Sequence, residues 1–333
     1  MSNDPFDSFT AERRATVRLA LATIFGAAAI DAIVPVTGGA SGASTFRVDS
    51  SGQRYLLRVE GIPSPLRNPH QYVSMRIAAE ARIAPRIHYA DDVGRIALID
   101  FIEQQPLRDY PGGPRALARA LGQLLAQVQA TPVFPSFVHY PDIVARLWAH
   151  VCRTGLFAPG VLDAHTAHLA SIREAYAWGS ANSVSSHNDP VPNNILFDGR
   201  RLWMIDWESA YRNDPLVDVA IVLDNLARSP EGEEALLRAW LGRAPEADLL
   251  GRLELTRALT RLYYAGVLFS ASAAASWTRG DTDLSAPTHQ EFQRAIREGR
   301  LQPGTPETKH ILGKMFLAAF FSGVAPPGLD AAV

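Results

Sequence analysis

Hydrophobic and polar positions change their spacing near residue 103. Before that point, short runs of alternating or β-branched residues predominate, and helical spacing is confined to residues 10–30 and 69–82. The predicted strands of this part are 45–48, 54–59, 86–90 and 95–102. The N-terminal part is therefore predicted to be a small lobe, mostly antiparallel sheet with one packed helix.

After residue 104, apolar residues recur at steps of three and four, the spacing of amphipathic helices. Residues 187–206 interrupt this pattern. Helices are predicted at 113–130, 140–155, 161–178, 216–228, 231–242, 246–278, 287–298 and 305–322. We therefore predict an α+β protein of two lobes, with a small antiparallel-sheet lobe at residues 1–103 and a larger, mainly helical lobe at residues 104–333.

The interrupting segment, HNDPVPNNILFDGRRLWMID at residues 187–206, holds the most constrained pattern of the chain. Its two prolines exclude a helix, so the DPVP part is a rigid loop. The apolar runs ILF and LWMI are predicted strands, joined by a tight Asp-Gly turn. A hairpin brings the residues near its open ends together, so Asn194 and Asp206 are predicted to lie side by side.

Three side chains of this segment suit phosphoryl transfer. Asp189 is predicted to accept the proton of an attacking hydroxyl, while Asn194 and Asp206 are predicted to hold magnesium against nucleotide phosphates. Turn and cap chemistry alone explains an isolated Asp-Pro-Asn string or an Asp that ends a strand. The complete pattern, HxDxxxxN followed by apolar run, turn, apolar run and Asp, favours an enzyme.

This pattern resembles the choline kinase and aminoglycoside phosphotransferase superfamily, which shares the protein kinase fold. The resemblance rests on residues 187–189 with Asn194, on IDWE at 205–208 and on NDPLVDVA at 213–220. The His-Asn-Asp and Asp-Trp-Glu variants look most like the bacterial choline and thiamine kinase branch. The resemblance implies a two-lobed kinase-like fold, ATP with magnesium as the donor, and the hydroxyl of a small molecule as the acceptor.

The resemblance also implies roles beside the catalytic loop. His187 is expected to pack that loop rather than to act as an acid or base. Asp218 opens a predicted helix and is expected to brace the loop through backbone hydrogen bonds, with a plain first-turn acid as the alternative.

On the nucleotide side, the expected phosphate-binding loop is the glycine-rich run ahead of a strand pair, because glycines let backbone amides approach phosphate oxygens. A simple turn is the alternative interpretation. The residues proposed to contact the nucleotide are Gly38, Gly39, Ser41, Gly42 and Arg58, with Asp100 and Ile102 at the junction of the lobes. The sequence does not separate ATP from GTP.

Arg58 takes the place of the lysine that kinases use on their third strand, because this chain has no lysine before residue 309. A guanidinium can clamp phosphate oxygens with two hydrogen bonds, although an outward-facing strand arginine is the alternative. The helical glutamate that orients this cation in the family is not evident. Its expected place falls at residues 71–73, which hold no acid, and Glu80 lies near the wrong end of the helix.

The sequence indicates the acceptor substrate less clearly than the nucleotide site. An ammonium group would need an aromatic cage, and the residues proposed for the acceptor site are Trp207, Glu208, Tyr211 and Tyr264. The paired late tryptophans of choline kinases are missing, and aromatic residues at helical spacing usually belong to the core. A polycationic aminoglycoside would need clustered acids, whereas Glu231, Glu233, Glu234, Glu246 and Asp248 look like helix-start acids.

Composition bears on the location of the protein and on the partners that it can bind. The 333-residue chain is 47% hydrophobic, and its net charge of −2 gives no basic field for nucleic acid. A single cysteine fits a reducing cytosol, the start MSNDPFDSF lacks the pattern of a secretory signal, and residues 15–34 and 315–326 are poor candidates for membrane spans. We therefore expect a cytoplasmic protein without nucleic-acid partner or membrane span. The oligomeric state is not indicated.

The preferred interpretation is an ATP- and magnesium-dependent kinase of a choline-, ethanolamine- or thiamine-like alcohol. An antibiotic phosphotransferase is the nearest alternative. A nucleotide-binding pseudokinase with a regulatory role is also open, since the helical glutamate and the lysine are missing. A metal-dependent hydrolase is less consistent, because it would need neither the glycine run nor Arg58.

Overall fold

The computed structural model describes residues 6, 9–26, 30–36, 43–61, 68–175, 182–276 and 278–322. The structural statements that follow concern these residues. The candidate phosphate-binding residues Gly38, Gly39, Ser41 and Gly42 lie outside the described residues.

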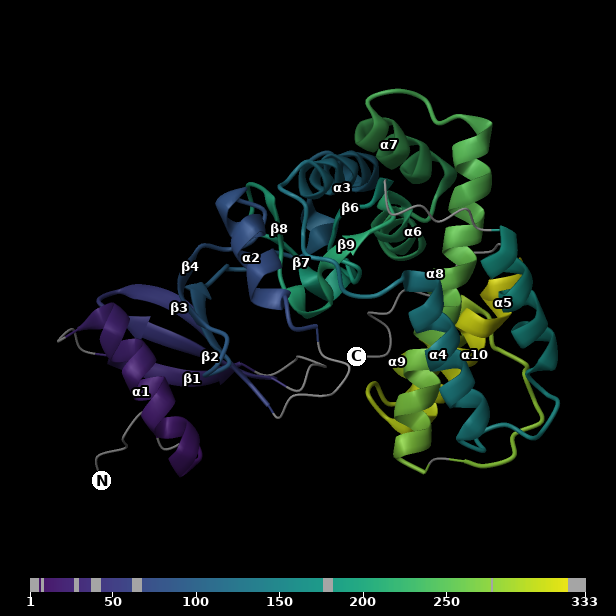
Figure 1. Ribbon diagram of the computed structural model, residues 1–333, viewed down its shortest axis with the longest axis horizontal. Coiled ribbons are helices and arrows are strands. Elements are labelled where there is room, and N and C mark those ends of the chain that lie inside the picture. The colour runs from purple at the N-terminus through teal and green to yellow at the C-terminus, as the bar shows by residue number, and fades with distance from the viewer. Residues whose placement is uncertain are drawn as a thin grey trace.

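A five-stranded antiparallel sheet forms the N-terminal lobe (Figure 1). Its spatial order is β1-β2-β3-β5-β4, so the strands follow one another along the chain except for the exchange of the last two. The strands are β1 (Ile30–Val36), β2 (Ala43–Ser50), β3 (Gln53–Glu60), β4 (Ile87–Asp91) and β5 (Ile96–Asp100). Together with the mainly helical remainder, this sheet confirms the predicted α+β, two-lobed fold.

The first strand was not predicted from the sequence. The predicted helix over 10–30 is shorter in the structure, because α1 (Ala11–Phe25) ends at Gly26, whose φ of 57° continues no helix. Residues 30–36 are instead the edge strand β1, which pairs with β2 from Ile30↔Ser50 to Val36↔Thr45. Its run IDAIVPV is rich in β-branched residues, which favour strands, and the helical spacing of the preceding residues does not continue into it.

Two helices pack against this sheet, where one was predicted. Helix α1 buries Val17 and Leu21 in one hydrophobic cluster with Leu57 and Leu98 of the sheet. Helix α2 (Gln71–Glu80) lies toward the helical lobe (Figure 1). The Ser74 hydroxyl of α2 donates a hydrogen bond to the backbone carbonyl of Ala210, at 2.8 Å. Helix α2 therefore ties the sheet to the segment that carries the catalytic hairpin.

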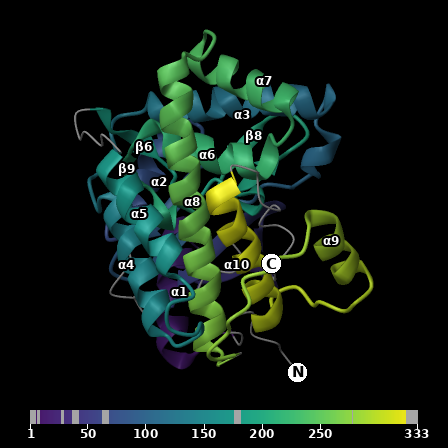
Figure 2. The same ribbon diagram turned by 90° about the vertical axis from the view of Figure 1, so that its right-hand side faces the viewer.

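Helix α8 (Ala247–Ala274) runs the length of the C-terminal lobe, and α4, α6 and α10 pack against it (Figure 2). The other helices and strands of this lobe are α3 (Gly113–Gln129), α4 (Tyr140–Arg153), α5 (Asp163–Ala175), β6 (Val184–Ser186), β7 (Ile195–Phe197), β8 (Leu202–Met204), β9 (Tyr211–Asn213), α6 (Pro215–Leu226), α7 (Pro230–Leu241), α9 (His289–Arg297) and α10 (Pro306–Ser322). The short β6–β9 pair was not predicted, because three-residue strands carry almost no pattern.

The division of the chain into two lobes at residue 103 stays a prediction. In the described part of the chain, no helix combines the length and the apolarity needed to cross a membrane.

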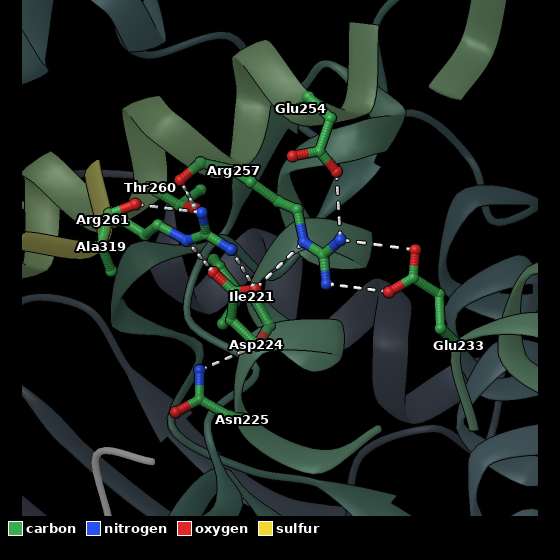
Figure 3. Close-up of polar contacts among 9 residues, drawn as sticks. All are labelled: Ile221, Asp224, Asn225, Glu233, Glu254, Arg257, Thr260, Arg261 and Ala319. Carbon is green, nitrogen blue, oxygen red and sulfur yellow. Dashed lines mark hydrogen bonds and ion pairs between the residues drawn. The ribbon is translucent and has the colours of Figure 1, made fainter. Parts of the chain in front are cut away.

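Helix α6 forms the centre of this lobe, and residues 216–224 are all buried. The carboxylate of Asp224 accepts hydrogen bonds from Arg257 Nε at 3.0 Å and from Arg261 Nε at 2.6 Å (Figure 3). Arg257 also reaches Glu233 of α7, at 3.0 Å. Asp224 and Arg261 are only 3% and 2% exposed, so each charge depends on the other for the interactions that water would supply.

Removing the Asp224 carboxylate should destabilise the protein strongly, because the buried guanidinium of Arg261 would lose its carboxylate partner and Arg257 would lose one of its three. We expect Asp224→Ala to lower the free energy of unfolding by about 3–5 kcal/mol. The control is Arg238→Ala, which breaks the exposed pair with Glu234 and should cost less than about 1 kcal/mol. Urea unfolding followed by tryptophan fluorescence measures both variants. Equal small losses would contradict this account of the network.

Candidate active site

A cleft of about 720 Å³ lies between the sheet and the helical lobe, within the size range of small-molecule sites. Residues of both lobes line it. Among them are Val36, Thr45, Arg58, Glu60 and Gln71 from the N-terminal lobe, Asp100 and Ile102 from the junction, and Asp189, Asn194, Asp206, Trp207, Glu208, Tyr263, Tyr264 and Lys309 from the C-terminal lobe. The cleft thus brings together most of the residues proposed from the sequence.

The loop that carries Asp189, predicted to be catalytic, is fixed by hydrogen bonds to helix α6. Asp218 is 1% exposed, and its two carboxylate oxygens accept backbone hydrogen bonds from His187 at 2.8 Å and from Asn188 at 2.7 Å. Asn188 has a φ of 63°, a left-handed conformation that asparagine tolerates better than most residues. Its side-chain amide donates to the backbone carbonyl of Ser209 at 2.9 Å, which fixes this turn of the chain.

His187 lies beneath the cleft and does not line it. Its Nε2 donates to the backbone carbonyl of Ile205 at 2.8 Å, and its ring centroid is 4.7 Å from that of Trp207. Burial lowers the pKa of His187, although the neighbouring Asp218 acts in the opposite direction. The ring therefore links the catalytic loop to the end of β8, and it has no access to a substrate in the cleft.

Asp189 lies between two polar groups from different elements. Its Oδ1 accepts a hydrogen bond from the Tyr264 hydroxyl of α8 at 2.7 Å, and its Oδ2 accepts one from Asn194 Nδ2 at 3.0 Å. Burial raises the pKa of Asp189 to about 7, and the nearby carboxylates of Asp206 and Glu208 act in the same direction. The two hydrogen bonds lower the pKa and thus offset part of this effect. A carboxylate with a pKa near neutrality is suited to proton transfer.

The hairpin places Asn194 and Asp206 at its open end. Residues of β7 and β8 pair antiparallel, and the Ile205 amide donates to the Asn194 carbonyl at 3.0 Å. Asp206 has a φ of 64°. Its buried Oδ1 makes no hydrogen bond within the described part of the chain, but it lies 2.8 Å from Arg58 Nη1.

These two residues fit a magnesium ion. The amide nitrogen of Asn194 is turned toward Asp189, which leaves its carbonyl oxygen as a ligand atom, and Asp206 supplies a carboxylate. Magnesium is usually held by one or two such protein oxygens together with substrate phosphates. In the ranges that the structure describes, no group of three or more His, Cys, Asp or Glu side chains is arranged for a metal. A site shared with a nucleotide therefore suits these residues better than a closed protein cage.

Arg58 points from β3 into the cleft and not outward. Its Nη1 and Nη2 lie 2.8 Å from Asp206 and 2.9 Å from Glu208, and its side chain is 17% exposed. The guanidinium therefore connects the sheet with the strand end that is expected to bind magnesium. This position suits contact with phosphate oxygens.

A third carboxylate near Arg58 comes from its own strand and was not predicted from the sequence. Glu60 lies two residues after Arg58, and its Oε1 is 4.0 Å from Arg58 Nε. At the place where the family's helical glutamate was expected, α2 begins with Gln71, whose side-chain amide donates to Glu60. Residues i and i+2 share one face of a strand, and that spacing is the signal that could have identified Glu60.

The other proposed residues divide into those that reach the cleft and one that does not. Asp100 and Ile102 line it at the lobe junction, and Asp100 also binds His88 at 2.6 Å. Trp207 lines the cleft from a mostly buried position, with its indole donating to the Met204 carbonyl at 3.2 Å. Tyr211 is buried against Phe137 and is not among the residues that line the cleft, whereas Tyr263, beside Tyr264, lines it.

A protein-family model and a curated relative both match parts of this chain. Residues 32–254 match the model of the phosphotransferase enzyme family. A stretch of 54 residues is 43% identical to the protein LicA of Haemophilus influenzae, and it covers 16% of this chain and 20% of that protein, so the chain spans about a fifth of the length of this curated relative.

Two solved structures share the fold. A choline/ethanolamine kinase family protein from Mesorhizobium loti superposes with a TM-score of 0.63 at 20% identity, covering 91% of this chain and 99% of that one. A spectinomycin phosphotransferase in complex with ADP and spectinomycin gives a TM-score of 0.57 at 12% identity, covering 90% of this chain and 98% of the other. The family model covers more than half of the chain. This protein belongs to the phosphotransferase enzyme family.

Proposed function

We propose that this protein transfers the γ-phosphoryl group of ATP, bound with magnesium, to the hydroxyl of a small choline-, ethanolamine- or thiamine-like alcohol. One observation carries the proposal. A carboxylate with a pKa of about 7, Asp189, lies in the same cleft as the magnesium-compatible pair Asn194 and Asp206 and the guanidinium of Arg58. General base, metal ligands and phosphate-binding cation are the parts that phosphoryl transfer needs.

The nucleotide side of the cleft is proposed to run from Asp100 and Ile102 at the lobe junction to Arg58. Backbone groups at the junction can bind the base, and Arg58 can bind phosphate oxygens by exchanging its present partners Asp206 and Glu208. Val36 and Thr45, on the two strands that flank the glycine run, line the same cleft. The strands on either side of the run therefore reach the proposed nucleotide side of the cleft. ADP in the spectinomycin phosphotransferase structure supports a nucleotide donor.

In the proposed reaction, the acceptor hydroxyl donates a hydrogen bond to Asp189 and transfers its proton to that carboxylate. The acceptor oxygen forms a bond to the γ-phosphorus while the bond from phosphorus to the bridging oxygen of ADP breaks. Asn194 and Asp206 would hold magnesium, which neutralises charge on the phosphates. Tyr264 and Asn194 keep Asp189 oriented through hydrogen bonds to its two oxygens. The products are ADP and a phosphate monoester.

A small alcohol fits the cleft better than a polycationic aminoglycoside. The acids considered for aminoglycoside binding lie outside the residues that line the cleft, and three of them pair with arginines: Glu233 with Arg257, Glu234 with Arg238 and Glu246 with Arg243. Aromatic rings of Trp207, Tyr263 and Tyr264 line the cleft and offer a surface for a small organic acceptor. A cytoplasmic location stays a prediction.

A direct test measures ATP consumption with magnesium against choline, ethanolamine, thiamine, amino sugars and aminoglycosides. Turnover of a small alcohol supports the proposal. Preferential turnover of an aminoglycoside favours an antibiotic kinase, and ATP binding without turnover of any acceptor favours a pseudokinase.

Removal of the central carboxylates should abolish turnover while the fold persists. We expect Asp189→Asn and Asp206→Ala each to lower kcat by at least about 100-fold, because the first loses the base and the second loses a magnesium ligand. The matched control is Asp248→Asn, the same chemical change at an exposed position of α8, which should leave kcat unchanged. Circular dichroism checks the folding of each variant. Wild-type turnover in either active-site variant would refute this mechanism.

The pH profile should report the raised pKa of Asp189. Only the deprotonated carboxylate accepts a proton, so kcat/KM should rise with pH and level off above about 7. The hydrogen bond from Tyr264 lowers this pKa, so Tyr264→Phe should move the rising limb to higher pH. Tyr263→Phe is the control, because this neighbour makes no hydrogen bond to Asp189 among the described residues, and the limb should stay in place. A limb near pH 4 in the wild type would contradict the assignment.

Arg58 should mainly affect the binding of ATP. We expect Arg58→Ala to raise the KM for ATP by about tenfold or more, since a charge-assisted contact to phosphate is lost, with a smaller effect on the KM for the acceptor. Arg47→Ala on the neighbouring strand β2 serves as the control, because Arg47 pairs with Asp49 and does not line the cleft. Nucleotide affinity that does not change in Arg58→Ala would count against this role.

A further inference from the structure

Lys309 is a cation of the cleft that the proposed reaction does not use. It lies near the start of α10, is half-buried, and lines the cleft together with Asp189 and Tyr264. It is one of only two lysines in a chain that otherwise relies on arginine. The other, Lys314, lies one turn further on and pairs with Asp281 at 2.8 Å.

Among the described residues, Lys309 differs from Arg58 and Lys314 in having no carboxylate partner. In the parts of the chain that the structure describes, its ammonium group makes no hydrogen bond or ion pair. Arg58, across the cleft, is paired with both Asp206 and Glu208. A partly desolvated ammonium without a partner attracts anions, and it disfavours a cationic group at the same place.

The packing of α10 on α8 locates Lys309 relative to the catalytic base. The two helices run antiparallel, since Ser272 of α8 donates to the carbonyl of Pro306 at 3.0 Å, while Tyr264 lies against Phe316, with ring centroids 5.7 Å apart. The ring of His310, the next residue, lies 5.5 Å from that of Phe269, so Lys309 belongs to the level of Phe269 and Ser270. This level is five to six residues beyond Tyr264, which corresponds to about 8 Å along the axis of α8.

The two oxygens of Asp189 separate a donor side from an acceptor side. Asn194, a proposed magnesium ligand, binds Oδ2, whereas Tyr264 binds Oδ1. The phosphates are expected on the Asn194 side and the acceptor on the Tyr264 side. Lys309 lies beyond Tyr264, and the wall between them is apolar, formed by Val267, Leu268 and Ala271.

We propose that the acceptor carries an anionic group, a carboxylate or a phosphate, which binds Lys309 while its hydroxyl lies against Asp189. This inference rests on the phosphoryl transfer proposed above, and it shifts the preferred acceptor from a choline- or ethanolamine-type cation to an alcohol that carries an anion. The acceptor is an alcohol whose anionic group is separated from the hydroxyl by a short carbon framework, which contacts the apolar wall. Choline and ethanolamine themselves lack this anion and are poorer acceptors than their anionic counterparts.

Matched acceptors test the proposal directly. Serine differs from ethanolamine by one carboxylate, and glycerate and glycerol 3-phosphate are anionic counterparts of glycerol. Steady-state kinetics with ATP and magnesium should give a kcat/KM at least about tenfold higher for an anionic member than for its uncharged or cationic counterpart, the effect of one charge-assisted contact. The glycerate and glycerol 3-phosphate arms distinguish a carboxylate from a phosphate. Equal or better turnover of ethanolamine and glycerol would overturn the proposal.

Charge reversal at Lys309 tests the same contact from the protein side. Lys309→Glu should remove the preference for the anionic member and leave the KM for ATP unchanged. Arg297→Glu, the same type of change at an exposed position of α9 outside the cleft, should keep the preference. A rise in the KM for ATP, or an equal loss of turnover with all acceptors, would assign Lys309 to the donor side and overturn the proposal.

If the proposed function is wrong, the result differs, because the protein then turns over no alcohol at all. Titration calorimetry with glycerol 3-phosphate, glycerate, serine, glycerol and ethanolamine then tests the anion site without chemistry. Binding of an anionic member to the wild type, but not to Lys309→Glu, supports the site. Binding that is absent or unaffected by this substitution rejects it.

Discussion

The burial of helix α6 is the constraint on which the active site depends. Because residues 216–224 are all shielded from water, the acids Asp218 and Asp224 must find internal partners. Asp218 binds the backbone of the catalytic loop, and Asp224 binds two arginines of α8. The same helix thus positions both the loop that carries Asp189 and the helix that carries Tyr264. The hydrogen bond between these two side chains joins elements that α6 has already aligned.

The local part of this site could be predicted from the sequence. The loop and the hairpin that carries Asn194 and Asp206 at its open end follow from prolines, turn residues and two apolar runs within twenty residues. The connection between the strands is longer than the predicted two-residue Asp-Gly turn and spans residues 198–201. Each of these signals acts between near neighbours, so no distant contact was needed to interpret them. For the same reason, the long helices were predicted at nearly the observed positions, with ends that differ by a few residues.

What could not be predicted depends on contacts between distant segments. Strand β1 becomes recognisable only through its pairing with β2. The hydrogen bond from Gln71 to Glu60 likewise joins residues eleven positions apart. Tyr211 and Tyr263 are both aromatic and both plausible in a cage, yet packing places the first in the core and the second at the cleft. Periodicity indicates that a side chain is buried on a helix or strand, but not which neighbouring element buries it.

The raised pKa of Asp189 also affects the stability of the protein. In the unfolded chain this carboxyl has an ordinary pKa of 3.8, whereas in the folded protein burial raises it to about 7, so the folded state holds the proton more tightly. Between these two values the unfolded state binds fewer protons, and the contribution of Asp189 to stability therefore falls as the pH rises. The full cost is present above about pH 7, where the carboxylate is charged. The side chain proposed as the base therefore opposes folding most in the pH range where it could accept a proton.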